Sequence, residues 1–349
     1  MRKIKNFMLF MLLVISGVAI GTGLGIVIGN NIGIGTTRTA ASQVPPPQYI
    51  EWGDYAYTHV HLPDTTAIFS PYSPSEGILF DPDNPPPVYH LDYFFSSFGE
   101  DIALFFKNIE TGFTYIHNPD RVFFGASLSK LNHALYIYKL AERGLIDMYA
   151  LHTFTAADHW GGTGILRFKP AGAQLTTREL LGHSIVHSCN AAFRMLVRYT
   201  ALIYPSFGSF LQEIGANGSL TRDIISQNTT ARDMGLWMYA VHYYLNSDSR
   251  YGHYFLYDLH NTAPTSHPYF TRWEGSFGVG YEVDVRLLQS DYPMARKYGW
   301  SINAFHDAAI IYGPSPFILV VLSNMDRGAH ELFEEISWLM QGFNGEWFV

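Results

Sequence analysis

The chain of 349 residues has little cysteine and little lysine, and both shortages exclude classes of protein. The single cysteine, Cys189, rules out an intramolecular disulfide and any zinc site built on two or four cysteines. A formal charge of −8 without clustered Lys and Arg excludes the phosphate-tracking surface that binding of nucleic acid requires. No His-Glu-x-x-His motif occurs, and we interpret His183 and His187, four residues apart, as core or surface histidines. We therefore expect neither a bound metal nor another cofactor.

The N-terminal segment predicts a membrane anchor. A basic tip (residues 2–5) precedes an uncharged run over residues 7–37, whose most apolar part, Phe7–Ile28, is 22 residues long. At about 1.5 Å per residue, a helix of this length crosses a hydrocarbon core of about 30 Å, and the basic flank places the rest outside the cytoplasm. A cleaved signal peptide is the alternative, although its apolar region is usually shorter. We expect a single-pass protein of the cell membrane with residues 1–35 as anchor and an extracytoplasmic body.

Glycines recur every four residues along this run, at positions 17, 21, 25, 29 and 33. On a helix they form one smooth face that a second helix can approach closely. The sequence leaves two interpretations open, which are a homodimer through this glycine face and a glycine-rich signal segment without a partner.

Behind the anchor, the sequence predicts a linker and then one domain. Residues 36–93 carry two triple prolines and no persistent period, which is typical of an extended, partly polyproline II segment. Strand patterns cover residues 101–106, 113–116, 308–312 and 317–322, and amphipathic helical patterns cover residues 177–186, 191–203, 230–245 and 329–340. Thr230 is the expected N-cap of the third of these helices. Strands at both ends with helices between them predict an α/β fold over residues 94–349, with one antiparallel sheet, flanking helices and an inserted helical cluster.

The segment Ser127-Leu128-Ser129-Lys130 carries the first candidate chemistry. It follows a strand pattern and opens a helical one, so Lys130 should lie one turn after Ser127 on the same face. A serine hydroxyl needs a neighbouring base to become a nucleophile, and a lysine amine can serve when burial or another cation lowers its pKa. At a helix start, the backbone N–H of Ser127 would also face a developing oxyanion. The competing interpretation is a helix cap followed by a solvated lysine.

The segment Ser188-Cys189-Asn190 lies between two helical patterns and is the second candidate. The hydroxyl of Ser188 could pass a proton between the nucleophile and a leaving amine. Asn190 offers an amide donor and an acceptor to a peptide-like substrate. By itself Ser-x-Asn is a weak signal, because it also occurs at residues 226–228 and 301–303.

The third candidate is Lys297-Tyr298-Gly299-Trp300, at the start of a strand pattern just before the terminal hairpin. Here Lys297 offers a fixed cation for a substrate carboxylate and can depress the pKa of a neighbouring lysine. Gly299 permits close backbone approach by the substrate, and the N–H of Trp300 is the candidate second oxyanion donor.

Ser-x-x-Lys, Ser-x-Asn and Lys-x-Gly in this order resemble the motifs of the penicillin-recognising serine enzymes, the class A β-lactamases and D,D-peptidases. The resemblance covers about residues 95–349 and includes the segments Gly162–Arg167 and Leu175–Leu181. It implies a β-lactamase/transpeptidase-like fold and a β-lactam or a wall-peptide-like amide as substrate. It further implies roles for eight residues. Ser127 would be acylated, Lys130 would be the base, Ser188 the proton shuttle, Asn190, Lys297 and Tyr298–Gly299 substrate-binding, and Ser127 with Trp300 the oxyanion hole.

Two departures from this family bear on the substrate. Class A β-lactamases carry a Glu that activates the deacylating water, whereas the matching stretch here, residues 220–228, holds only Asp223 as a carboxylate. Slow release of a β-lactam acyl group is therefore expected. Tyr298 stands where the family usually has Thr or Ser, whose hydroxyl helps to hold the substrate carboxylate.

Other interpretations of the same residues lead to different functions. A non-catalytic relative would keep the fold and bind wall peptide without turnover, but such a protein needs no complete set of catalytic side chains. Cys189 could suggest a cysteine nucleophile, yet it occupies the variable position of Ser-x-Asn. We interpret His306-Asp307 as structural residues near the start of a strand.

Overall fold

The computed structural model describes residues 87–216, 228–262, 288–325 and 330–348, and the side chains of 331–348 in the last range. The expected anchor, the glycine face, most of the linker and Asp223 lie outside these residues. Within the described ranges, no helix is long and apolar enough to cross a membrane.

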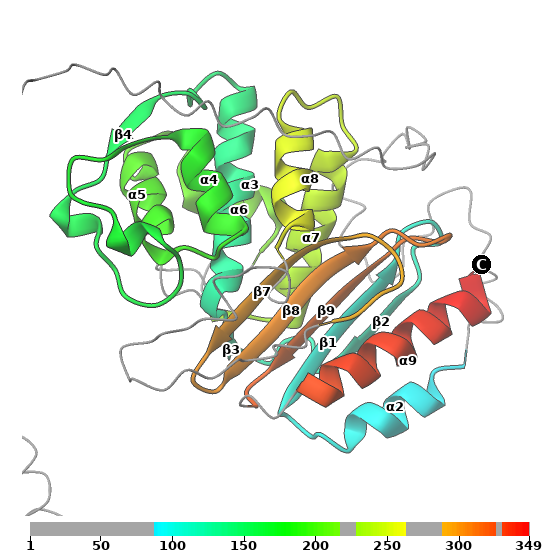
Figure 1. Cartoon of the computed structure of the whole chain (residues 1–349). Coiled ribbons are helices and arrows are strands. Elements are labelled where there is room, and N and C mark those ends of the chain that lie inside the picture. The colour runs from blue at the N-terminus through cyan, green and yellow to red at the C-terminus, as the bar shows by residue number, and fades with distance from the viewer. Residues whose placement is uncertain (1–86, 217–227, 263–287, 326–329, 349) are drawn as a thin grey trace, which may run out of the picture. The chain divides into compact units, whose positions relative to one another are not determined.

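The expected antiparallel sheet is present, in the strand order β2-β1-β9-β8-β7 (Figure 1). Its strands are β1 (Ile102–Asn108), β2 (Thr114–His117), β7 (Met294–Ser301), β8 (Ala304–Ile311) and β9 (Phe317–Ser323). β1 pairs with β9, so the two ends of the domain meet in the middle of the sheet, and β7 is left as an edge strand. This edge is the one that borders the helical cluster.

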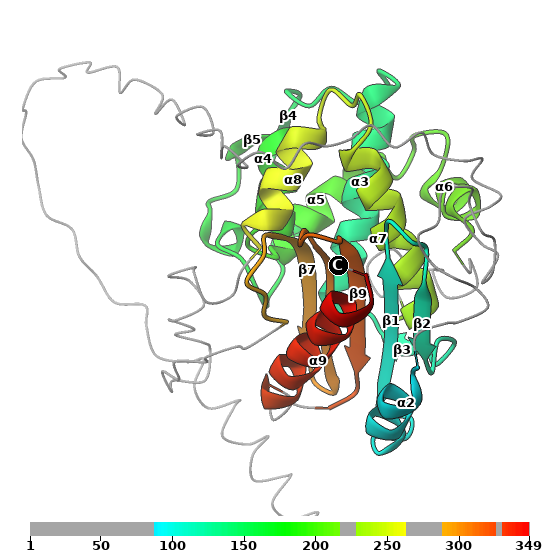
Figure 2. The ribbon, with the colours of Figure 1, turned by 90° about the vertical axis from the view of Figure 1, so that its right-hand side faces the viewer.

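The outer face of the sheet is covered by α2 (Tyr89–Ser96) and α9 (His330–Phe348), as Figures 1 and 2 show. α2 is a helix where the sequence showed no helical period, and the expected boundary at residue 93 falls inside it. Leu91 and Phe95 are both fully buried and four residues apart, so one apolar contact per turn holds this short helix. A helix of eight residues forms because it packs on the sheet, since its propensity alone would not stabilise it.

The inner face carries the helical cluster. Its helices are α3 (Ser129–Glu142), α4 (Thr177–Ile185), α5 (Asn190–Thr200), α6 (Phe207–Ile214), α7 (Ala231–Leu245) and α8 (Gly252–His260). The predicted N-cap is confirmed, because the Thr230 hydroxyl accepts a hydrogen bond from the Asp233 N–H at 3.1 Å. α7 packs directly on the sheet, where a Cβ at Gly235 would lie 2.5 Å from the Phe105 ring. Side chains alternate between the two faces of a strand, so Leu104 and Phe106, on either side of Phe105 in β1, point to the opposite face and pack with residues of α9.

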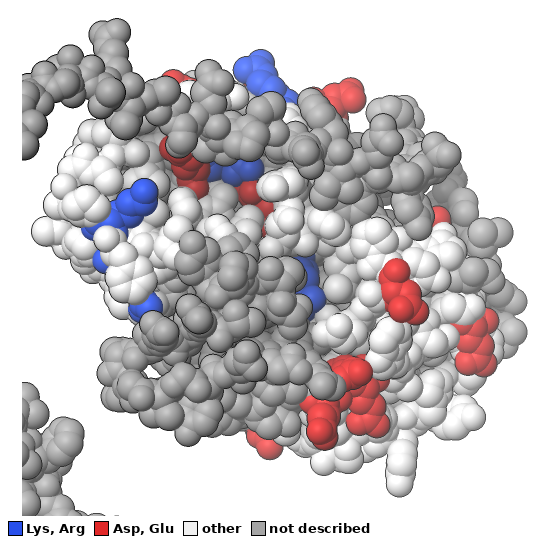
Figure 3. Space-filling view, in the orientation of Figure 1, with Lys and Arg blue, Asp and Glu red and all other residues white. Residues whose placement is uncertain are grey.

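Two further pairs of short strands lie outside the main sheet. β3 (Phe123–Phe124) pairs with β6 (Asn228–Thr229) and leads into a single 3-10 turn, η2 (Ala126–Leu128). β4 (Leu151–Thr153) pairs with β5 (Gln174–Thr176) at the far side of the cluster. On the face seen in Figure 3, the described Lys and Arg side chains are scattered and form no basic patch.

Candidate active site

Ser127 lies in the middle of η2, between β3 and α3, and is half-buried. The preceding Ala126 has φ +46°, a conformation that costs energy in a residue with a Cβ and is typical of functional turns. Gly299 of β7 lies against this turn, because a Cβ there would be 2.9 Å from the Gly125 carbonyl oxygen and 3.2 Å from Leu128 Cγ. The sequence predicted that Gly299 lets the substrate approach closely. What the described structure shows is the approach of the nucleophile's own turn.

Lys130 is the second residue of α3, one turn after Ser127, and its side chain reaches back to Ser127. Its Nζ is 2.8 Å from Ser127 Oγ, 2.7 Å from the Ser188 carbonyl oxygen and 2.7 Å from Asn190 Oδ1. The carbonyl and the amide oxygen can only accept, and a neutral amine has two N–H groups. Both are therefore engaged, and the lone pair of the amine is left for the Ser127 hydroxyl proton.

Burial lowers the pKa of Lys130 from 10.5 to about 7, with Cys189 opposing the shift weakly. The side chain is 2% exposed, so its charged form has lost most of its water. No carboxylate is among the described groups that shift this pKa. A substantial fraction of Lys130 is thus neutral at neutral pH, which is the state a general base requires.

Ser188 sits between the two lysines in a strained backbone conformation. It is fully buried, with φ +49°, and its Oγ is 3.2 Å from Lys130 Nζ and 3.1 Å from Lys297 Nζ. Its carbonyl oxygen accepts hydrogen bonds from Lys130 and from the Thr163 hydroxyl. The structure therefore brings the predicted nucleophile, base and shuttle into one connected chain of polar atoms.

Asn190 is the first residue of α5, and its amide has a fixed orientation. Its Nδ2 donates to the Gly161 carbonyl oxygen at 2.9 Å, so Oδ1 faces Lys130. The Asn190 backbone N–H donates to the Thr163 carbonyl oxygen at 3.1 Å. Asn190 thus positions the base, and one Nδ2 hydrogen remains for the substrate amide that the sequence predicted it to bind.

The loop over residues 161–164 overlaps the segment Gly162–Arg167, which resembles the family in sequence, but no role was predicted for it. Gly162 and Gly164 have φ +89° and +96°, which a residue with a side chain adopts only with strain. A Cβ at Gly162 would lie 2.5 Å from Asn190 Nδ2, and one at Gly164 would lie 2.3 Å from Cys189 Sγ. The two glycines flanking Thr163 were the available signal, because they let the loop pack on Ser188–Asn190.

Lys297 extends from β7 and is fully buried. Its Nζ donates to Ser188 Oγ at 3.1 Å and to the Tyr298 carbonyl oxygen at 2.8 Å, and it lies 4.1 Å from the centre of the Tyr298 ring. Burial lowers the pKa of Lys297 well below its usual value, the charge of Lys130 lowers it further, and Asp307 opposes both. The charge of Lys130 thus acts on Lys297, whereas Lys297 is not among the groups that shift the pKa of Lys130, so the depression of the Lys130 pKa by Lys297 stays a prediction.

Tyr298 is 2% exposed, and burial raises its pKa. Arg296 and a hydrogen bond involving the Ser188 side chain act against that rise, which places the phenol beside the shuttle. Trp300 follows Gly299 in β7, and its side chain packs on the core under the sheet. β7 therefore brings the Trp300 backbone near η2, and the oxyanion roles of Ser127 and Trp300 stay predictions.

His306 holds in place the strand β3, which leads to the nucleophile. It is fully buried on β8, where its Nδ1 accepts the Ser323 N–H at 3.1 Å. Its Nε2 therefore carries the proton and donates to the Phe124 carbonyl oxygen at 2.8 Å. Burial lowers the pKa of His306 to about 4, so the ring is neutral. This side chain ties β3, and with it the turn of Ser127, to the sheet, in agreement with the structural role expected for it.

The other candidate groups of the sequence lie apart from this chemistry. The rings of His183 and His187 are 5.4 Å apart, and in the described ranges no group of three or more His, Cys, Asp or Glu could hold a metal. Cys189 is fully buried against Gly164.

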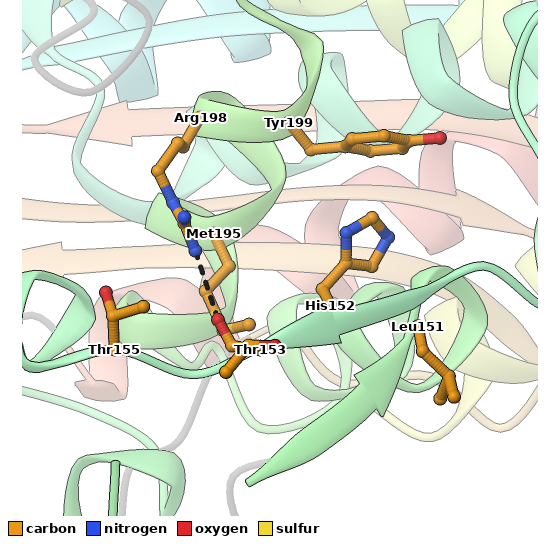
Figure 4. A pocket seen from close by; sticks show the side chains of 7 residues that line it. All are labelled: Leu151, His152, Thr153, Thr155, Met195, Arg198 and Tyr199. Atoms are coloured by element: carbon orange, nitrogen blue, oxygen red, sulfur yellow. Dashed lines mark hydrogen bonds between the residues drawn. The ribbon is translucent and has the colours of Figure 1, made fainter. Parts of the chain in front are cut away.

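A cavity of about 400 Å³ lies between β4 and α5 (Figure 4). It is lined by Leu151, His152, Thr153, Thr155, Met195, Arg198 and Tyr199, and by no residue of the candidate site. Its cation, Arg198, is paired with Asp158 at 2.9 Å and donates to the Thr153 carbonyl oxygen at 3.3 Å. The cavity is therefore separate from the chemistry around Ser127.

Comparisons with known proteins agree with this arrangement. PBP-A is similar in structure, with a TM-score of 0.61 and 18% identity over 74% of this chain and 98% of that one. A mutant of PBP-A, solved as an acyl-enzyme complex with penicillin G, gives 0.59 and 16% over 73% and 95%. A β-lactamase from Sphaerobacter thermophilus gives 0.56 and 19% over 69% and 91%. At these identities the likeness shows the β-lactamase/transpeptidase-like fold.

The sequence itself was also compared with curated proteins and with family models. No curated protein matches. The model described as "Beta-lactamase enzyme family" matches residues 89–340, which is most of the chain and begins with α2. This protein therefore belongs to the β-lactamase enzyme family.

Proposed function

We propose that this protein is a serine hydrolase that forms an acyl-enzyme at Ser127, with a β-lactam or a wall-peptide-like amide as acyl donor. The observation that carries the proposal is the 2.8 Å contact between Lys130 Nζ and Ser127 Oγ, with both N–H groups of the neutral amine engaged elsewhere. A binding protein without catalysis has no need of a buried lysine in this state. The expected N-terminal anchor would place the enzyme on the outer side of a cell membrane.

Acylation then follows from the contacts. Lys130 takes the Ser127 proton as Oγ forms a bond to the substrate carbonyl carbon. As the C–N bond breaks, the Ser188 hydroxyl gives its proton to the leaving nitrogen and receives one from Lys130 across 3.2 Å. Burial favours return of Lys130 to its neutral form.

Release of the acyl group is the slower half-reaction in this proposal. Hydrolysis needs a base for the attacking water, and residues 220–228, which match the stretch of class A β-lactamases that supplies this base, contain no Glu. This observation favours the alternative of a D,D-carboxypeptidase- or transpeptidase-like enzyme with slow deacylation over a fast β-lactamase. The acyl-enzyme should accordingly be long-lived and open to capture by an amine.

The test incubates the full-length protein in detergent with a β-lactam or an activated thioester and follows the adduct by intact mass and peptide mapping. A stoichiometric adduct on Ser127 is expected. Ser127→Ala should abolish it, whereas Ser129→Ala, whose hydroxyl bonds only to the Ala126 carbonyl oxygen among the described groups, should retain it. An adduct elsewhere, or none with an intact fold, would refute the proposal.

A further inference from the structure

The ammonium of Lys297 has no donor left for a substrate. An ammonium has three N–H groups. Two of them reach Ser188 Oγ at 3.1 Å and the Tyr298 carbonyl oxygen at 2.8 Å. The third direction is occupied by the Tyr298 ring, whose centre is 4.1 Å away, well inside cation–π distance. The side chain is also fully buried, so water does not reach it.

The other described cations around the site are engaged as well. Arg296, beside Lys297 in β7, is paired with Asp307 and donates to a backbone carbonyl. Arg194, one turn after the start of α5, lies over the Trp160 ring at 4.5 Å. Arg167 donates to a carbonyl of the glycine loop. Each of these three described arginines thus already contacts another group of the protein, and none of the contacts is with Ser127, Lys130 or Ser188.

Tyr298 is the residue that produces this arrangement. A short hydroxyl side chain at this position would leave the third N–H of Lys297 open, whereas the phenol ring covers it. The ring is itself 2% exposed and lies beside Ser188, so it fills space next to the proton shuttle. A carboxylate placed there would lose its water without gaining an ion pair, which is strongly unfavourable.

We propose that this site selects acyl donors with no carboxylate beside the scissile bond, that is, neutral esters, thioesters or internal amides, and that Tyr298 is the residue that sets this preference. The inference rests on the proposed acylation at Ser127 and narrows its substrate class. It disfavours β-lactams and D,D-carboxypeptidase substrates, which carry a carboxylate beside the scissile bond, and favours internal amides and esters. It reverses the role that the sequence predicted for Lys297, which becomes a partner of Ser188 and of Lys130 rather than a ligand for the substrate.

The experiment uses two matched pairs of acyl donors with the full-length protein. One pair is benzylpenicillin and its methyl ester, and the other is an N-acylglycyl thioglycolate thioester and its methyl ester. Within each pair only the carboxylate differs. The rate of adduct formation on Ser127 is measured by quenched mass spectrometry. We expect the ester to react at least about tenfold faster than the acid, the scale of one lost charge-assisted hydrogen bond.

Two variants of Tyr298 test the cause. Tyr298→Thr uncovers Lys297 and should raise the rate of acylation by the acids about tenfold or more. The ratio of ester to acid rate in each pair should then approach one. Tyr298→Phe keeps the ring and should keep the wild-type ratio. Near-UV circular dichroism checks that both variants are folded. If Tyr298→Thr does not fold, the ratio of the ester and acid rates in the wild type still tests the inference.

The outcomes separate this inference from the proposed function. If the wild type reacts faster with the acids than with the esters, the inference is wrong and acylation at Ser127 stands. The same holds if Tyr298→Thr folds and leaves the ratio unchanged. If none of the four compounds acylates Ser127, the proposed function fails, and the inference fails with it.

Discussion

Raising the pH through about 7 should switch on acylation at Ser127. Burial holds the pKa of Lys130 at about 7, and the protonated amine has no lone pair for the serine proton. At that pKa about one-tenth of the molecules are neutral at pH 6 and about nine-tenths at pH 8, by simple titration. A lysine with an ordinary pKa would be neutral in only about one molecule in 3,000 at pH 7. The shift thus raises the reactive population by about 10³-fold.

The assay measures the first-order rate of adduct formation with a saturating neutral thioester between pH 5 and about 9.5. The expected rate rises about tenfold from pH 6 to 8 and is then level. Lys130→Arg is the matched variant, because it keeps a cation that stays protonated over this range, and it should lose about 10³-fold.

Two results would refute this reasoning. A rate that is flat from pH 6 to 8 would mean that another group removes the proton. A rate that is still climbing about tenfold per pH unit at pH 9.5 would mean that Lys130 keeps an ordinary pKa in the folded protein. Stability offers an independent check, because the unfolded chain keeps this proton up to the ordinary lysine pKa while the folded chain releases it at about 7. Folding should therefore gain about 1.4 kcal/mol per pH unit from Lys130 between these values, and Lys130→Met should remove that slope.

Three further predictions concern the supports of the site. Gly299→Ala should slow acylation at least about tenfold with a modest fall in melting temperature, because the new Cβ displaces the turn of the nucleophile; equal rates would show that the turn yields freely. His306→Ala should lower the free energy of unfolding by about 2–5 kcal/mol in denaturant titrations, since it leaves the Phe124 carbonyl and a strand N–H unpaired. Gly164→Ala should cost about 1–3 kcal/mol by the same measurement, because it forces a left-handed residue against Cys189, and an unchanged midpoint would contradict the packing described here.

The local sequence determined much of the fold. Caps and periodicity placed α4, α5 and α7 within a few residues, because a helix start needs a side-chain acceptor such as that of Thr230 and a buried face needs apolar spacing. The terminal hairpin of β8 and β9 was readable because its strands are continuous apolar runs around a proline-rich turn. α2 was not readable, since eight residues with one apolar contact per turn become helical only against the sheet.

The sequence by itself also indicated the side chains that we propose for the chemistry, because Ser127, Lys130, Ser188 and Lys297 belong to motifs whose spacing is local. Only the tertiary structure decided which groups each of them contacts. Ser188 and Asn190, which enclose the Lys130 amine, lie 58 and 60 residues from it in the chain, and Ser188 lies 109 residues from Lys297. Desolvation and the direction of a hydrogen bond depend on these distant neighbours, so no reading of a single motif contains them.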